Sequence, residues 1–424
     1  MRTLAVTGSI LMICSFARAQ VLPVISVSDV NRVEKILAAD DMQGRRVFTA
    51  GIEKARAFIS DEFKAAGLKP LTGASDYDQT FVMADRESVE VSATLDGIPI
   101  DQKNIAIFSS EPSISITDAD SYRKIIVKNQ AEFSKFFFSY FQSDQNVLIL
   151  VDTSLARRFA RIANLHAPQF EGSGNRIFIL TPLDPQRYQI RMTQRISRKK
   201  LTNLVGIIPG KSKPGEYVIF SAHYDHLGMG KPDAAGDSIY NGANDDASGV
   251  TAVISLAKYF SKINNNQRTL IFAAFTAEEI GEFGSAYFSR KVDPDKVVAM
   301  LNIEMIGTES KWGKNSAYLT GYDKTDMGPI LQKNLLNSPF RFYPDPYPEQ
   351  MLFLRSDNAS LAKKGVPAHT ISTSKMDSEK YYHTQGDAVE TLDLDNMTEI
   401  ISAIGLSAGS IISGEDSPQR VKPE

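Results

Sequence analysis

The 424-residue sequence has few residues of the kinds that cross-link a chain or hold it in a membrane. It has one cysteine, Cys14, so no intrachain disulfide can form and the fold must depend on its hydrophobic core. No apolar run reaches the roughly 18 residues that a membrane-spanning helix needs. A G-x-S-x-G motif is also absent, which argues against a serine hydrolase built around a nucleophile elbow.

Charge of one sign is not concentrated anywhere in the chain. There are 47 Lys and Arg residues against 50 Asp and Glu, and the densest basic run is only RISRKK at 195–200. This balance argues against a nucleic-acid or membrane-surface partner. The 42% hydrophobic content is typical of a globular protein with a sizeable core.

The first twenty residues, MRTLAVTGSILMICSFARAQ, have the pattern of a secretory signal peptide. A charged start, an apolar middle and Ala17-Arg18-Ala19 predict cleavage after Ala19. We therefore expect an exported protein, periplasmic or secreted, whose mature chain has no cysteine.

The pattern of apolar residues along the chain predicts an α/β fold. Two early helices are expected, at 28–39 with Ser28 as cap and at 50–66 with Gly67 as stop signal. Later, continuous apolar strands alternate with helices, which indicates a mixed, mostly parallel sheet flanked by helices. The expected strands are 216–222, 268–276, 297–303 and 366–372, and the expected helices are 247–262 and 395–412.

Residues 85–200 have a different texture, with short β-like runs such as VEVSATL, NVLILVD and RIFILT between polar stretches. We interpret them as an inserted β-containing region of uncertain fold. The predicted division is a signal peptide at 1–19, two parts of one main domain at 20–84 and 201–424, and the insertion at 85–200.

Metal-binding residue types follow the predicted strands. His223 follows the strand 216–222, Glu278-Glu279 follow 268–276, Glu304 follows 297–303, and His383 lies beyond 366–372. The carboxyl ends of parallel strands meet at one edge of a sheet. Crowded carboxylates repel one another unless a cation compensates them, and imidazole with carboxylate suits zinc.

Each of these residues also has a structural interpretation. Glu278-Glu279 could open a solvated helix, and Asp245-Asp246 could cap the helix that begins near 247. A single histidine is commonly a structural residue. The clustering on successive strand ends is what favours a metal site.

Five segments in order resemble the motifs of the two-zinc aminopeptidase family: HYDHLG, NGANDDASG, TAEEIGEFGS, NIEMIG and YHTQGD. That family includes bacterial leucyl aminopeptidases and glutamate carboxypeptidase, with the transferrin receptor and glutaminyl cyclases as relatives. The stretches 40–71 and 355–368 fit it as well. The resemblance covers 40–75 and 200–400, which it implies are catalytic, and leaves 85–200 unmatched. Relatives often have a protease-associated domain at this point of the chain, so the resemblance implies that 85–200 is an inserted lid or protease-associated-like region.

The resemblance implies a zinc-exopeptidase-like fold and two zinc ions. It implies that His223 and Glu304 bind one zinc, that Glu279 and His383 bind the other, and that Asp245 bridges both. Glu304 departs from the family pattern, in which an aspartate usually stands at this position, so the metal spacing could differ here.

Further roles follow from the same resemblance. Asp225 would hold the other nitrogen of the His223 imidazole, and Glu278 would be the general base. Arg355, Ser356, Asp357 and Tyr382 are candidates for substrate binding. We expect His226 to be a loop residue that lines the pocket and His369 to lie in the core.

The function expected from this pattern is hydrolysis of N-terminal residues from peptides by metal-activated water, which makes the protein a metallo-aminopeptidase. Its partner would be a peptide with a free amino terminus. Alternatives within the family are a carboxypeptidase or dipeptidase, and a glutaminyl cyclase with one zinc. A receptor-like binding module is the non-enzymatic alternative.

Overall fold

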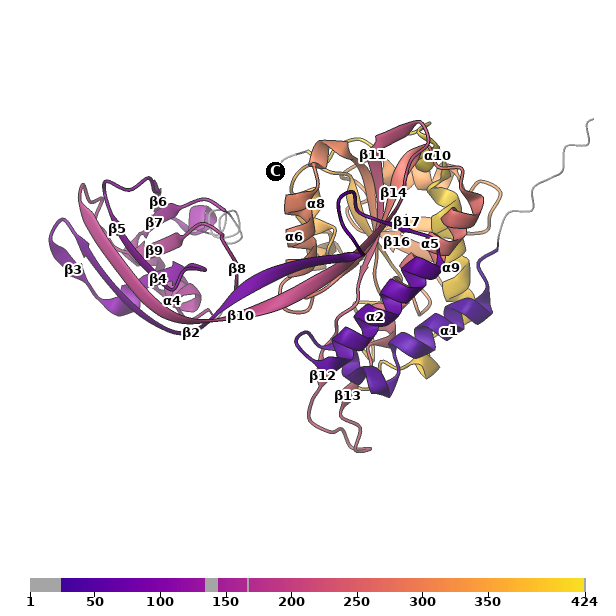
Figure 1. Cartoon of the computed structure of the whole chain (residues 1–424), viewed down its shortest axis with the longest axis horizontal. Helices are drawn as coiled ribbons and strands as arrows, with labels where there is room; N and C mark the ends of the chain where they lie inside the picture. Colours follow the sequence, from indigo (N-terminus) through magenta and orange to yellow (C-terminus); the bar gives the residue numbers. More distant parts are fainter. Residues whose placement is uncertain (1–23, 134–143, 166–167, 423–424) are drawn as a thin grey trace, which may run out of the picture.

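The computed structural model describes residues 24–133, 144–165 and 168–422, so the predicted signal peptide lies outside the described residues. The chain forms a large lobe and a small lobe joined by two long paired strands, β2 (Asp78–Leu95) and β10 (Tyr188–Ile208) (Figure 1). Within the described part of the chain, no helix combines the length and apolarity needed to cross a lipid bilayer.

The large lobe is built on a mixed sheet, as the sequence predicts. Its strands follow the order β17-β16-β18-β15-β11-β14-β10-β2-β3. The central strands β11, β14, β15 and β18 are parallel, and β10 pairs antiparallel with β14. The strands not yet bounded are β1 (Lys69–Pro70), β3 (Ile98–Ile100), β11 (Lys213–His223), β14 (Arg268–Phe275), β15 (Val297–Ile303), β16 (Ser316–Leu319), β17 (Arg341–Pro344) and β18 (Ala368–Ser372).

Helices cover both faces of this sheet, which explains why its central strands read as unbroken apolar runs. Alternate residues of β14 enter two separate cores: Phe272 packs in one and Ile271 in the other. The first core includes α1 (Val27–Leu37), α2 (Ala50–Ala65), α5 (Ser248–Ile263), α7 (Met327–Lys333), α9 (Leu394–Ser407) and α10 (Gly409–Ser413). The second includes α6 (Phe283–Lys291) and α8 (Ala359–Ala362).

Two details of the helices differ from the prediction. Ser26, not Ser28, caps α1, because its hydroxyl accepts the backbone N–H of Asp29. The predicted helix 395–412 is divided into α9 and α10. The predicted second helix and its stop at Gly67, which has φ +77°, are confirmed.

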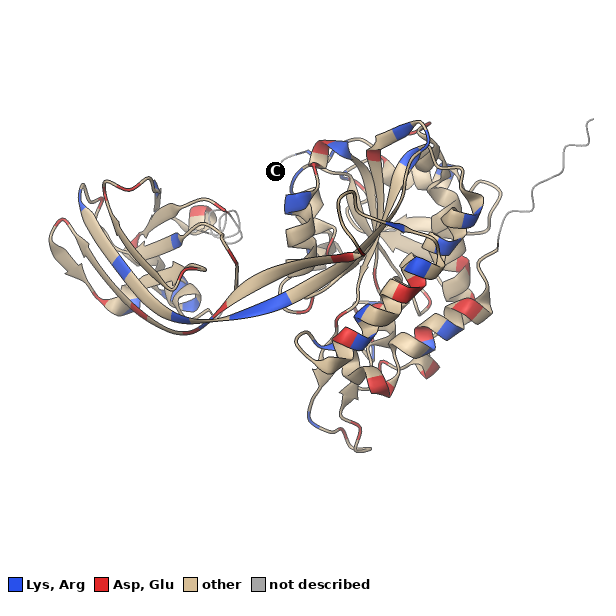
Figure 2. Ribbon diagram, in the orientation of Figure 1, with Lys and Arg blue, Asp and Glu red and all other residues tan. Residues whose placement is uncertain are grey.

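Charges of both signs alternate along α1 and α2 (Figure 2). Arg32 on α1 and Lys258 on α5 both pair with Glu62 on α2, at 2.9 and 2.6 Å. These ion pairs tie together three helices that cover one face of the sheet.

The small lobe is the inserted β-rich region. It contains a four-stranded sheet of order β4-β9-β7-β6 and packs a core of its own. The predicted boundaries, 85 and 200, fall inside β2 and β10, because these strands run continuously through both lobes. The remaining elements are β4 (Ile105–Phe108), β5 (Ser113–Thr117), β6 (Arg123–Val127), β7 (Val147–Val151), α4 (Ala156–Ala163), β8 (Gln169–Phe170) and β9 (Arg176–Leu180).

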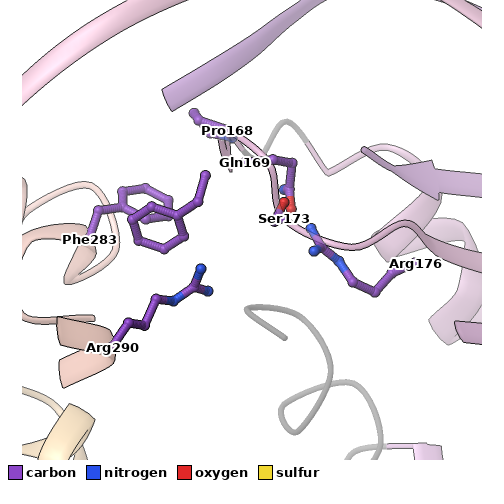
Figure 3. Close-up of a pocket in the computed structure, with 7 residues that line it drawn as sticks. Pro168, Gln169, Ser173, Arg176, Phe283 and Arg290 are labelled. Carbon is purple, nitrogen blue, oxygen red and sulfur yellow. The ribbon is translucent and has the colours of Figure 1, made fainter. Parts of the chain in front are cut away.

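The two lobes also meet at α6 (Figure 3). The Phe170 ring from the small lobe lies 5.7 Å from the ring of Phe283, and the Arg290 guanidinium lies 4.1 Å above Phe170. Arg290 also pairs with Asp144 at 2.7 Å. The small lobe is therefore anchored to the helix that follows Glu278-Glu279.

Candidate metal centre

The parallel strands bring the candidate residues to one edge of the large sheet. His223 is the last residue of β11 and lies opposite Phe275, the last residue of β14. Glu304 directly follows β15, whose Ile303 lies opposite Ile371 of β18. Asp245 comes from the short segment Ala243–Ala247 that precedes α5.

The Asp245 carboxylate lies between two imidazoles. Its Oδ1 is 3.2 Å from His223 Nε2, and its Oδ2 is 3.2 Å from His383 Nε2. Hydrogen bonds to Asp245 and Glu279 raise the pKa of His383 to about 10. The two oxygens of one carboxylate thus each lie beside a different imidazole nitrogen.

Glu279 is held on the His383 side of the cluster. Its Oε2 lies 3.3 Å from His383 Nε2, and its Oε1 lies 2.8 Å from His226 Nδ1. Burial opposes ionisation of Glu279, but the hydrogen bonds to His226 and His383 lower its pKa to about 2.

His226 was expected to be a loop residue that lines the pocket. It does lie in a loop, but it does not line the cavity beside Glu304. Its side chain is buried and contacts Glu279. In the sequence, the position of His226 three residues after the candidate ligand His223 could have indicated that it lies beside the metal centre. His369, by contrast, is fully buried in β18, and burial lowers its pKa to about 4, so its predicted place in the core is confirmed.

Glu278 and Glu279 do not open a helix. They lie in a turn after Ala277, which has φ +61°, and α6 begins only at Phe283. Burial raises the pKa of Glu278 well above its ordinary value, and Glu304 adds to this effect while His223 opposes it. Glu279, by contrast, contacts His383 and His226 directly.

The predicted role of the Asp225 carboxylate is wrong. His223 Nδ1 lies 3.1 Å from the backbone carbonyl of Asp225 and 3.9 Å from its carboxylate. That carboxylate instead accepts the backbone N–H groups of Glu278 and Glu279, at 3.1 and 3.4 Å. The turn directs two donors at one buried charge, and this arrangement determines where the side chain lies.

Two further buried carboxylates hold backbone segments around the centre. Asp246 accepts the N–H groups of His223, Gly249 and Met305, at 3.3, 3.0 and 3.0 Å, so its contact with α5 resembles the helix cap considered from the sequence. Asp387, the last residue of the YHTQGD segment, accepts the N–H groups of Asn244 and Asp245, at 2.7 and 3.0 Å.

Glu304 is largely buried, and burial raises its pKa to about 7. The hydroxyl of Ser356 donates to its carboxylate, and the Asn302 amide donates to the same hydroxyl at 2.7 Å. Ser356 therefore contacts a candidate ligand, and it also lines the cavity beside Glu304, as expected for a substrate-binding candidate.

A cavity of about 60 Å³ opens beside Glu304. Arg355 and Tyr382 line it, as expected for substrate-binding candidates, together with Met305, Leu352 and Met376. Asp357 is fully buried and does not line the cavity; burial raises its pKa to about 8.

The donor set fits a divalent metal. The buried Nε2 of His223 has no hydrogen-bond partner although it points at Asp245. His226, Asp245 and Glu279 each offer one ligand atom, and these atoms lie within 4.8 Å of one another. Imidazole and carboxylate donors at this density are the ligands that zinc prefers in proteins.

The comparisons with known proteins agree with the motif pattern. Residues 203–407 match the model of peptidase family M28. These 205 residues are just under half of the chain. The matched residues include all the predicted metal ligands, from His223 to His383.

Related sequences cover only parts of the chain. A probable zinc metalloprotease of Pyrenophora tritici-repentis is 33% identical over 109 residues, which are 25% of this chain and 24% of that protein. A probable leucine aminopeptidase of Arthroderma otae is 27% identical over 212 residues, 47% of this chain and 54% of that one. The chain thus spans about a quarter to a half of the length of these relatives.

A similarity of fold extends over both lobes. The zinc aminopeptidase BSAP from Bacillus subtilis has a TM-score of 0.55 at 14% identity and covers 95% of this chain and 99% of its own. The 5% of this chain that the alignment leaves out is far shorter than the insertion. The aligned part must therefore include most of the small lobe. The two lobes therefore share the fold of that structure.

Proposed function

We propose that the protein is a zinc-dependent exopeptidase that hydrolyses N-terminal residues from peptides. The observation that carries the proposal is the Asp245 carboxylate, whose two oxygens each lie 3.2 Å from a different imidazole nitrogen. A carboxylate in this position suits a bridge between two metal ions.

In this proposal, His223 and Glu304 would hold one zinc ion, Glu279 and His383 would hold the other, and Asp245 would serve both. His226 fixes Glu279 through Oε1, which leaves Oε2 directed at the metal position. When bound, zinc lowers the pKa of a water molecule and polarises the carbonyl group of the substrate.

Glu278 would be the general base. It is partly buried, and burial raises its pKa, which favours acceptance of a proton from the attacking water. The same carboxyl group can then deliver that proton to the leaving amine. The cavity beside Glu304 would receive the substrate side chain, with Arg355 and Tyr382 in contact with it.

A comparison of substrates with free and acetylated amino termini tests the reaction class. An aminopeptidase cleaves aminoacyl anilides with a free amine, ignores their N-acetyl forms, and loses activity to a chelator until zinc is restored. Release of C-terminal residues from N-blocked peptides would identify a carboxypeptidase instead. Cyclisation of N-terminal glutamine without cleavage, with one bound zinc, would identify a glutaminyl cyclase.

Two wider expectations belong to this proposal. The protein would be exported, so the mature chain should begin at Gln20. The small lobe would act as a lid that restricts which peptides enter, because it is anchored to α6, directly after the turn that carries Glu278. N-terminal sequencing and activity measurements on peptides of increasing length test these two points.

A further inference from the structure

Arg45 lies in the early segment DDMQGRRVF (40–48), and its side chain is only 1% exposed. A buried guanidinium requires acceptors for its N–H groups. Arg45 donates four hydrogen bonds, all to backbone carbonyls: those of Leu37 at 2.8 Å, Tyr224 at 3.0 Å, Asn241 at 2.6 Å and Gly242 at 2.8 Å.

Three of these carbonyls belong to the two loops that carry candidate ligands. Tyr224 lies between His223 and Asp225, while Asn241 and Gly242 lead into Asp245. One planar group therefore joins the loop after β11 to the loop before α5 at fixed distances.

The surrounding backbone packs closely against the same loops. At Gly44, which has φ +64°, a Cβ would lie 2.4 Å from the carbonyl oxygen of Tyr240 and 2.6 Å from that of Gly228. The backbone N–H of His226 also donates to the carbonyl of Arg45, at 3.3 Å. The segment before Arg45 thus contacts both loops directly.

We infer that Arg45 is a positioning residue, whose guanidinium fixes the spacing between His223 and Asp245 and thereby sets the zinc affinity of the centre. This inference rests on the proposed function, because it takes these two residues to be zinc ligands. Residues that orient metal ligands typically change metal affinity 10- to 100-fold when they are replaced.

Arg268 provides a matched control. It is also buried, at 2% exposed, and also donates to backbone carbonyls, those of Ile411 at 2.7 Å and Asp416 at 2.6 Å. It is the first residue of β14, at the end of the strand opposite to the one that leads to Glu278. Its loss should therefore affect folding without affecting the candidate centre.

The test measures three quantities in Arg45→Lys, Arg45→Met, Arg268→Lys and Arg268→Met. These are the zinc dissociation constant by competition with a chromogenic chelator, the melting temperature of the metal-free chain, and the absorption spectrum of the cobalt-loaded chain. We expect the Arg45 variants to weaken zinc binding by about 10-fold or more and to alter the cobalt spectrum. The Arg268 variants should lower the melting temperature and leave zinc binding and the spectrum unchanged.

Zinc binding by Arg45→Lys at the wild-type affinity would overturn the inference, as would equal weakening in the Arg268 variants. If Arg45→Met does not fold, the lysine variant, which keeps the charge but not the planar group, decides the question. A wild-type chain that binds no zinc would instead refute the proposed function, so the two failures are distinguishable.

Discussion

Replacing Asp225 by asparagine should slow turnover more than it lowers metal content. The carboxylate accepts the N–H groups of Glu278 and Glu279, and the amide nitrogen of an asparagine cannot accept either of them. One hydrogen bond to a charged acceptor, about 1.5–3 kcal/mol, would be lost. Displacement of the turn by about 1 Å would cost on the order of 10² in kcat.

The assay compares kcat at saturating zinc, zinc per chain by atomic emission, and the free energy of unfolding in urea. Asp152→Asn is the control, because Asp152 also accepts a backbone N–H group, that of Ser154 at 2.8 Å, but lies in the small lobe. It should leave kcat unchanged. If Asp225→Asn lost one zinc per chain and kept normal kcat in the fully loaded fraction, the carboxylate would hold His223 as the sequence suggested, and our structural explanation would be wrong.

Three other predictions concern the centre and its neighbouring lobe. Glu278→Gln should keep both metals and lower kcat by on the order of 10²- to 10⁴-fold. Glu279→Gln should instead weaken the binding of one zinc ion. If enzyme assays and metal analysis found mild and similar effects for the two variants, Glu278 would not be the general base and Glu279 would not be a ligand. Glu304→Asp should stay active, while Glu304→Ala should lose a metal, and full zinc occupancy in the alanine variant would exclude Glu304 as a ligand. Phe170→Ala should destabilise the chain by about 3–5 kcal/mol in urea unfolding and should speed cleavage of long peptides more than of dipeptides; unchanged length preference would argue against a lid.

The main sheet could be predicted because its central strands are buried on both faces. Strand 297–303 has the bounds of β15, and 268–276 is one residue longer than β14, since continuous apolar runs end where the chain reaches the polar edge. The small lobe could be recognised only as β-rich. Its joining strands, β2 and β10, run through both lobes without an intervening loop, so no turn signal in the sequence marks where one lobe ends.

The candidate ligands could be predicted because the carboxyl ends of parallel strands meet at one edge of the sheet. The contacts between the loops at that edge could not be predicted from the sequence. Asp225 lies two residues after His223 in sequence, yet its carboxylate accepts backbone N–H groups from a turn some fifty residues away, because the fold brings that turn beside the end of β11. Arg45 acts through contacts that depend on the packed fold, and sequence spacing alone carries no sign of them.

An anomalous difference map from zinc-soaked crystals tests the central claim most directly. We predict two zinc peaks, one beside His223 and one beside His383, with the Asp245 carboxylate between them. A single peak, or a peak coordinated by His226 and Glu279 without His223, would contradict the two-zinc centre.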